Sequence, residues 1–154
     1  MRSLLMDAVD RKILAELQRD GRMTVTDLAH RVQLSISRCQ RRLRELERDG
    51  VIHGYRAVVD AAALGFGFEA LVFAKLRLDT MADFDRALAD VPNVVEAQRL
   101  FGSPDYLLRV VTADLASYQR LYEETLAKLP GVRGLTSTIV MKQVIEPRPL
   151  PTSP

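Results

Sequence analysis

Two amphipathic helical segments separated by a very short turn occupy residues 24–50, and this feature limits the fold of the chain more than any other. In the first segment, Leu28, Ala29 and Val32 fall on one helical face. The second segment has an apolar stripe spaced by three or four residues, which consists of Ile36, Cys39, Leu43 and Leu46. Because only residues 33–35 separate the two segments, the helices must pack at an angle. The pattern predicts a helix-turn-helix.

The face of the second helix opposite this stripe is rich in arginine. Residues 1–58 contain 12 Lys and Arg, 11 of them Arg, against 8 Asp and Glu, whereas residues 59–154 contain 10 against 12. The positive excess therefore coincides with the helix pair, and arginine can bind phosphate and guanine through two hydrogen bonds at once. The sequence predicts double-stranded DNA as a partner, with these contact residues: Ser35, Ser37, Arg38, Gln40, Arg41, Arg42, Arg44 and Arg48.

Position along the helix divides the roles of these residues. Ser37, Arg38 and Arg41 lie toward the start of the helix and are expected to meet base edges, while Arg42 and Arg44 are better placed for phosphates. The competing interpretation is an ordinary solvated charged face, which is the usual location of arginine runs.

The segments before and after the helix pair complete a first domain, which we place at residues 1–58. Asp7 with Asp10, Thr24 with Asp27, and Ser35 have the composition of helix N-caps, so three helices are expected. Residues 51–59 are β-branched and interrupted by glycine, which indicates either a small wing or a separate strand. Residues 59–67 are expected to be a linker.

From Phe68 the pattern changes to the alternation typical of a β-strand, which continues to Leu78. Leu71 and Phe73 interrupt the polar side, so another subunit is expected to cover part of that face. Helices opening at Thr80 and Asp114 and strands over 94–101, 106–112 and 135–145 complete the order βαββαβ. This order predicts an α+β protein whose second domain, residues 68–146, is ferredoxin-like. The proline-rich tail, residues 147–154, is expected to be flexible or extended.

Composition narrows the functional classes. A single cysteine and no apolar run near the ~18–20 residues of a membrane span favour a cytoplasmic protein without a membrane partner. The apolar stretch at the start of the sequence is too short for a signal peptide, because charged residues follow it at once. His30 and His53 have no acidic or thiol partner at ligand spacing, and no catalytic constellation stands out, so neither a metal site nor an enzyme is expected. Cys39, on the apolar stripe, is expected to be a buried structural thiol.

The whole chain resembles the Lrp/AsnC (leucine-responsive, feast/famine) family of transcription regulators. The matching stretches are Asp7-x-x-Asp10-Arg-Lys-Ile-Leu14, Gly21-Arg22, Thr24-x-x-Asp27-Leu28-Ala29, Ser35 with Cys39, Leu43-x-x-Leu46-Glu47-x-x-Gly50-Val-Ile52, Gly54-Tyr55, Gly102-x-x-Asp105-Tyr106-Leu107 and Leu129-Pro-Gly-Val132. The resemblance implies a DNA-binding helix-turn-helix joined to a βαββαβ ligand-sensing domain. It also implies dimers that form through the sheet and that commonly assemble into octamers.

The same resemblance points to an amino-acid effector, with no other cofactor, at the loop Gly102-Ser-Pro-Asp-Tyr106. Loop amides around Gly102 could hold an α-carboxylate, and Asp105 could accept hydrogen bonds from an α-ammonium group. A strand of a neighbouring subunit would supply the opposite wall. The candidate effector residues are Phe101, Gly102, Ser103, Asp105, Tyr106, Thr138, Ile139 and Val140. The alternative interpretation is a hairpin turn that needs these residue types for its backbone geometry.

One departure from the family pattern lies at the start of the recognition helix. Family members often have prolines in a Ser-Pro-x-Pro-Cys stretch, where this chain has Ile36 and Arg38. Ile36 is expected to extend the buried stripe, and Arg38 adds a positive group near the groove. Two other functions remain open at this point. One is an architectural DNA-binding protein without an effector, and the other is an enzyme similar to the siroheme decarboxylases.

Overall fold

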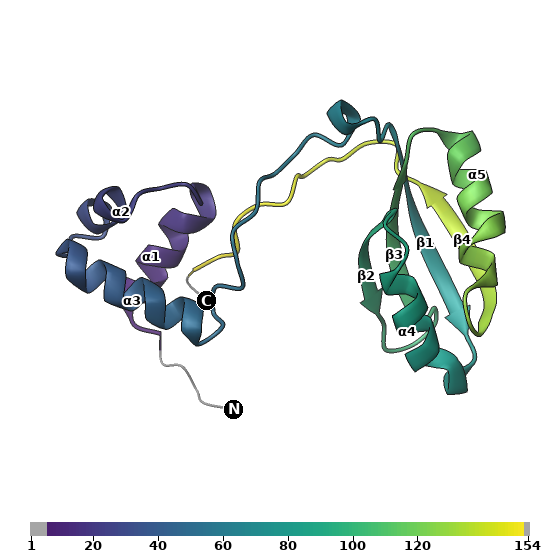
Figure 1. The fold of residues 1–154 in the computed structure, drawn as a ribbon, viewed down its shortest axis with the longest axis horizontal. Coiled ribbons are helices and arrows are strands. Elements are labelled where there is room, and N and C mark those ends of the chain that lie inside the picture. The colour runs from purple at the N-terminus through teal and green to yellow at the C-terminus, as the bar shows by residue number, and fades with distance from the viewer. Residues whose placement is uncertain (1–5, 153–154) are drawn as a thin grey trace. The chain divides into compact units, whose positions relative to one another are not determined.

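The computed structural model describes residues 6–152; residues 1–5 and 153–154, the outer ends of the expected first domain and tail, lie outside the described part. Contacts divide the chain into two units (Figure 1). The helical unit comprises the chain up to Val58 together with the residues from Ile145 onward, and the sheet unit comprises Val59–Val144. The tail therefore belongs with the helices.

Three helices form the helical unit: α1 (Ala8–Arg19), α2 (Val25–Arg31) and α3 (Ile36–Arg48). The expected caps of the first two are confirmed. The Asp7 carboxylate accepts from the N–H groups of Val9 and Asp10, and the Asp10 carboxylate accepts in return from the N–H of Asp7. Thr24 accepts from the N–H of Asp27. Ser35 occupies the N-cap position of α3, but its side chain makes no capping hydrogen bond.

The core of the helical unit consists of Ile13, Leu28, Ala29, Val32, Cys39 and Leu46. Ile36 is absent from it, because this side chain is 52% exposed. The expectation that Ile36 extends the buried stripe was therefore wrong. Ile36 is the first residue of α3, and Leu34, in the turn before it, packs against the core. Gln33 makes that turn with a φ of 58°.

Residues 51–59 form neither a wing nor a strand in the described chain. Their backbone finds no strand partner, and a side-chain contact holds the segment to α3 instead, since the Tyr55 hydroxyl donates to Glu47 Oε1 at 3.0 Å. Burial and this hydrogen bond raise the pKa of Tyr55 to about 12. A short 3₁₀ turn, Ala62–Leu64, follows.

The sheet unit has four antiparallel strands in the order β2-β3-β1-β4 (Figure 1). Their bounds are β1 Phe68–Leu76, β2 Val94–Arg99, β3 Tyr106–Thr112 and β4 Val132–Ile139, and the helices are α4 Met81–Ala89 and α5 Leu115–Glu124. The predicted α+β class and the ferredoxin-like βαββαβ order are confirmed.

Three of the four strands have boundaries that differ from the prediction, and β2 ends at Arg99 rather than at residue 101. β1 ends at Leu76. The N–H of Arg77 makes one last hydrogen bond across to the carbonyl of Gly131, and Leu78 then lies 83% exposed in a 3₁₀ turn. β4 begins at Val132, earlier than expected, and ends at Ile139. Its pairing with β1 stops where the N–H of Val140 meets the carbonyl of Glu69, next to the first residue of β1.

Both helices cover one face of the sheet, and the other face is open. Inward residues of β1 pack with Phe84 of α4 and Tyr118 of α5. On the open face Leu71 and Phe73 are only half-buried, which leaves apolar area on the sheet that this chain does not cover. Within residues 6–152, no helix is long and apolar enough to cross a membrane.

Candidate DNA-binding face and effector loop

The outward face of α3 presents a row of exposed polar and basic side chains. These are Ser37, Arg38, Gln40, Arg41, Arg44 and Arg48, with Ser35 exposed at the N-cap. Arg41 pairs with Glu45 at 2.9 Å and Arg48 with Asp49 at 3.0 Å, and in both pairs an exposed arginine meets a partly exposed carboxylate. Arg38 and Arg44 form no ion pair with any other described residue. Their guanidinium groups are therefore fully available to an external anion.

Arg42 departs from the expected phosphate contact. Its Nη1 lies 2.7 Å from Asp7 Oδ2 and 2.8 Å from Asp10 Oδ1, and its side chain is only 26% exposed. Hydrogen bonds to Asp10 and Asp7 raise the pKa of the Arg42 guanidinium. Both partners stand at the N-terminus of α1, so Arg42 joins α3 to α1, and its partly covered guanidinium is less available to an external anion than that of Arg44. Arg42 is therefore a contact between helices and not a free phosphate ligand of the kind expected from the sequence.

The thiol of Cys39 behaves as the sequence predicts for a structural residue. It is fully buried in the helical core, and burial raises its pKa. A raised pKa keeps the thiol protonated and unreactive.

Asp105 holds the candidate effector loop to the end of β1. Its Oδ2 accepts from the N–H of Leu76 at 2.8 Å, and its own N–H donates to the carbonyl of Ala74 at 3.0 Å. The N–H of Leu100 closes the loop by donating to the Asp105 carbonyl at 2.7 Å. The N–H groups of Gly102 and Ser103 donate to no acceptor in the described chain. Asp105 thus has one oxygen, Oδ2, that holds the loop to β1, and a second oxygen, Oδ1, that accepts no hydrogen bond within residues 6–152.

Tyr106 does not belong to the effector loop surface. It is 3% exposed and points into the core between the sheet and α4, where its hydroxyl donates to Asp85 Oδ1 at 2.6 Å. Burial, together with this hydrogen bond, raises its pKa to about 12. The sequence places Tyr106 next to the loop, but the alternation of β3 turns its side chain to the helix-covered face. Phe101, in contrast, is completely exposed.

A hollow of about 360 Å³ lies beside the loop on the open face of the sheet. Its lining consists of Phe73, Lys75, Pro104, Gly134, Leu135 and Thr136. The volume falls in the range of roughly 300–1,000 Å³ typical of small-molecule sites. Sequence reasoning missed the β1 and β4 residues here, because they become neighbours of Pro104 only through strand pairing. The charge of Lys75, in a strand of mostly apolar residues, was the signal for this site that the sequence offered.

Thr138, Ile139 and Val140 lie far from the loop within one chain. The loop contacts β1 at Ala74, whereas the N–H of Val140 contacts β1 at Glu69. These two points lie five residue positions apart along β1, which is about 16 Å. The two candidate walls can meet only if a second copy of the chain supplies one of them.

Comparison with known proteins decides the family. A sequence profile described as the Lrp/AsnC ligand binding domain matches residues 69–150, and one described as winged helix-turn-helix DNA-binding matches residues 6–53. The leucine-responsive regulatory protein of Rhizobium meliloti is 41% identical over 142 residues, covering 90% of this chain and 91% of the relative. The Bkd operon transcriptional regulator of Pseudomonas aeruginosa is 38% identical over 143 residues, covering 91% and 94%. This chain belongs to the Lrp/AsnC family.

Solved structures of Lrp/AsnC regulators agree with this assignment. A transcriptional regulator from Neisseria meningitidis, solved in complex with L-Met, superimposes with a TM-score of 0.91 at 33% identity over 96% of this chain and 97% of its own. An AsnC family regulator from Agrobacterium tumefaciens gives a TM-score of 0.87 at 36% identity over 95% and 97%. The chain is therefore a transcriptional regulator with a DNA-binding helical unit and a ligand-binding sheet unit, and not an enzyme.

Proposed function

We propose that the chain is a sequence-specific regulator that binds an operator in double-stranded DNA through α3 and responds to an amino acid. The observation that supports DNA reading best is the pair of unengaged guanidinium groups, Arg38 and Arg44, on the exposed face of α3. Arg38 stands in the first turn of the helix, where side chains of recognition helices reach base edges. Arg44 lies two turns further on, where a phosphate contact is expected. Such a regulator acts at the chromosome, which in a prokaryote lies in the cytoplasm.

Substitution separates the two roles of these arginines. With Arg38→Ala we expect an operator affinity weaker by about 1–3 kcal/mol and a relaxed preference at one base pair. Arg41→Ala is expected to do the same if Arg41 leaves Glu45 for a base. Arg44→Ala should weaken specific and non-specific DNA alike and reduce the dependence on salt. Fluorescence anisotropy titrations on an operator and on scrambled DNA measure both. Equal affinity for the two DNAs in the wild-type chain would instead support an architectural protein.

For the effector site, the proposed ligand is an amino acid bound at the loop and the hollow beside it. The free N–H groups of Gly102 and Ser103 suit a carboxylate, the unused Oδ1 of Asp105 suits an ammonium group, and Lys75 adds a positive charge at the rim. The Neisseria relative, solved with L-Met, makes an amino acid the first class to test. We propose that Thr138–Val140 of a second copy complete the site.

Asp105 offers a matched pair of variants for this proposal. Asp105→Asn keeps an acceptor oxygen for the N–H of Leu76 but removes the charge, whereas Asp105→Ala removes both. We expect Asp105→Asn to fold normally and to lose amino-acid binding at least tenfold, since an ammonium–carboxylate contact contributes about 1.5–3 kcal/mol. Isothermal titration with a panel of amino acids, methionine and leucine included, measures this loss. Unchanged binding by Asp105→Asn would exclude the carboxylate from the site.

We also propose a homodimer formed through the open face of the sheet, with octamers as the expected higher assembly. This face has an apolar patch, the half-buried Leu71 and Phe73. A polar edge lies beside the patch, where Arg109 binds Glu69 through two hydrogen bonds of 2.8 and 2.9 Å. Such a patch is typical of subunit interfaces. Phe73→Glu is expected to yield monomers in light scattering after size exclusion. The matched control, Leu78→Glu, changes an exposed residue away from this face and should leave the assembly intact.

Two recognition helices in one dimer would contact DNA one helical turn apart, about 34–36 Å, so the operator should be a loose palindrome. An amino acid that binds between copies would favour one assembly or angular arrangement over another. This difference in binding is what allosteric control requires.

A further inference from the structure

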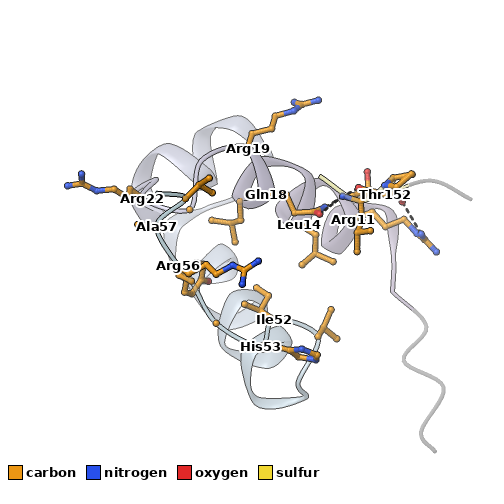
Figure 2. A pocket seen from close by; sticks show the side chains of 18 of the residues that line it. Arg11, Leu14, Gln18, Arg19, Arg22, Ile52, His53, Arg56, Ala57 and Thr152 are labelled. Carbon is orange, nitrogen blue, oxygen red and sulfur yellow. Dashed lines mark hydrogen bonds between the residues drawn. The ribbon is translucent and has the colours of Figure 1, made fainter. Parts of the chain in front are cut away.

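The tail returns to the helical unit and lies against α1. Gln18 Nε2 donates to the carbonyl of Leu150 at 3.2 Å, and the N–H of Leu150 donates to Gln18 Oε1 at 2.7 Å. Near the other end of α1, Arg11 Nη1 donates to the carbonyl of Thr152 at 2.9 Å. The tail therefore runs antiparallel to α1 and is held at two points (Figure 2).

The spacing on α1 matches an extended segment. Arg11, Leu14 and Gln18 recur at intervals of three and four residues, so they lie on one side of the helix (Figure 2). The polar residues at the two ends of this stripe take the main chain of the tail. Leu14 between them lines the same groove as Leu150 and Pro151. This groove, about 1070 Å³, is bounded by α1, residues 51–58 and the tail residues 150–152.

Proline suits the tail to this contact. Pro149 and Pro151 have no N–H, so Leu150 carries the only main-chain donor among these three residues, and that donor is the one bound by Gln18. Prolines also favour the extended conformation before docking, which lowers the entropy lost on binding. The Gln18 amide donates one hydrogen bond to the main chain of Leu150 and accepts one from it. Such a contact recognises an extended backbone and not the identity of the side chain.

We propose that Leu150–Thr152 form an intramolecular strap, docked on the Arg11–Leu14–Gln18 face of α1 in the same chain. The chain passes between the two units at Val58–Val59 and again at Val144–Ile145. With the strap docked, the second crossing ends at a fixed point on α1, so the sheet unit is tied to the DNA-binding helices at two places instead of one. The strap thereby reduces the freedom of the helical unit that DNA binding must otherwise remove.

Disulfide trapping tests the docking in the full chain, independently of any DNA binding. Gln18→Cys combined with Leu150→Cys, incubated with oxidised glutathione, should form a disulfide whose intact mass is that of one chain. Lys12→Cys with Leu150→Cys is the control, because Lys12 is exposed on another side of α1. A disulfide-linked dimer would show that the tail docks on a second copy, and equal trapping in both variants would show that it does not dock. Either result overturns the strap.

A second measurement tests its consequence and rests on the proposed DNA function. A chain ending at Glu146 should bind an operator with two half-sites about three- to tenfold more weakly than the full chain, and a single half-site with unchanged affinity. Equal affinities for the two-half-site operator would overturn the strap's role in DNA binding. If the full chain shows no specific DNA binding at all, the proposed function fails, and the disulfide result still decides whether the strap exists.

Discussion

Arg42 and Arg44 lie two positions apart on α3, but Arg42 is paired with Asp7 and Asp10 while Arg44 pairs with no other described residue, and the effect of this contrast can be measured. Replacing Arg42 by Met keeps the aliphatic stem and the helix propensity while removing the guanidinium. The lost contacts are the two ion pairs to Asp7 and Asp10, at 2.7 and 2.8 Å, made by a side chain that is 26% exposed. Arg44→Met is the matched control, because Arg44 is exposed and pairs with no other described residue.

The expected loss of stability for Arg42→Met is about 1–2 kcal/mol. A partly exposed ion pair contributes up to ~1 kcal/mol, and two share this guanidinium. The loss stays below that of a fully buried pair because water and the positive end of the α1 dipole still stabilise the two carboxylates. Arg44→Met should change the free energy of unfolding by less than ~0.5 kcal/mol. Urea denaturation followed by circular dichroism at neutral pH measures both, and anisotropy with operator DNA should show the reverse order of effects.

The pH dependence gives an independent check. The N–H of Asp10 and the Arg42 guanidinium lower the pKa of Asp7 below its ordinary 3.8. A lowered folded pKa means that this carboxylate stabilises the fold above pH ~4 and that the contribution is lost as the pH falls through the folded pKa. The stability difference between wild type and Arg42→Met should therefore shrink below pH ~4. If Arg42→Met is as stable as Arg44→Met at neutral pH, or loses DNA affinity to the same extent, the structural role assigned to Arg42 is refuted.

Two further predictions concern the sheet unit. Gly131→Ala should lower the free energy of unfolding by about 1–3 kcal/mol in urea denaturation, because Gly131 has a φ of 74° and an added Cβ would overlap the Thr80 side chain. Gly134→Ala is the control, since a Cβ there meets nothing within 4 Å, and it should cost less than half as much. Tyr106, with a pKa of about 12 against 10.0 unfolded, should keep the fold more stable below pH 10, with that contribution lost between pH 10 and 12. Tyr106→Phe should flatten this part of the stability profile, and a profile as steep as that of the wild type would contradict the assignment.

Local signals were sufficient for most of the fold. The capping residues Asp7 and Thr24 act through contacts within a few positions of the chain, and the apolar pattern of residues 106–112 is itself local, so both were predicted correctly. The order βαββαβ then left few ways to build an antiparallel sheet with both helices on one face. The end of β1 and the shift of β4 were missed, because both depend on which distant backbone groups remain to pair.

Site residues divide along the same line. The sequence by itself determined a basic, exposed face on α3, since helical periodicity alone separates Arg38 and Arg44 from the buried Cys39. Only the tertiary structure decided that Arg42 is held by α1, that Tyr106 faces the core and that one Asp105 oxygen is already used. The same applies to the tail, whose contact with Gln18 spans 132 positions of sequence. Periodicity reports which face of an element is apolar, but the partner of a polar side chain depends on which elements meet, and only the folded chain determines that.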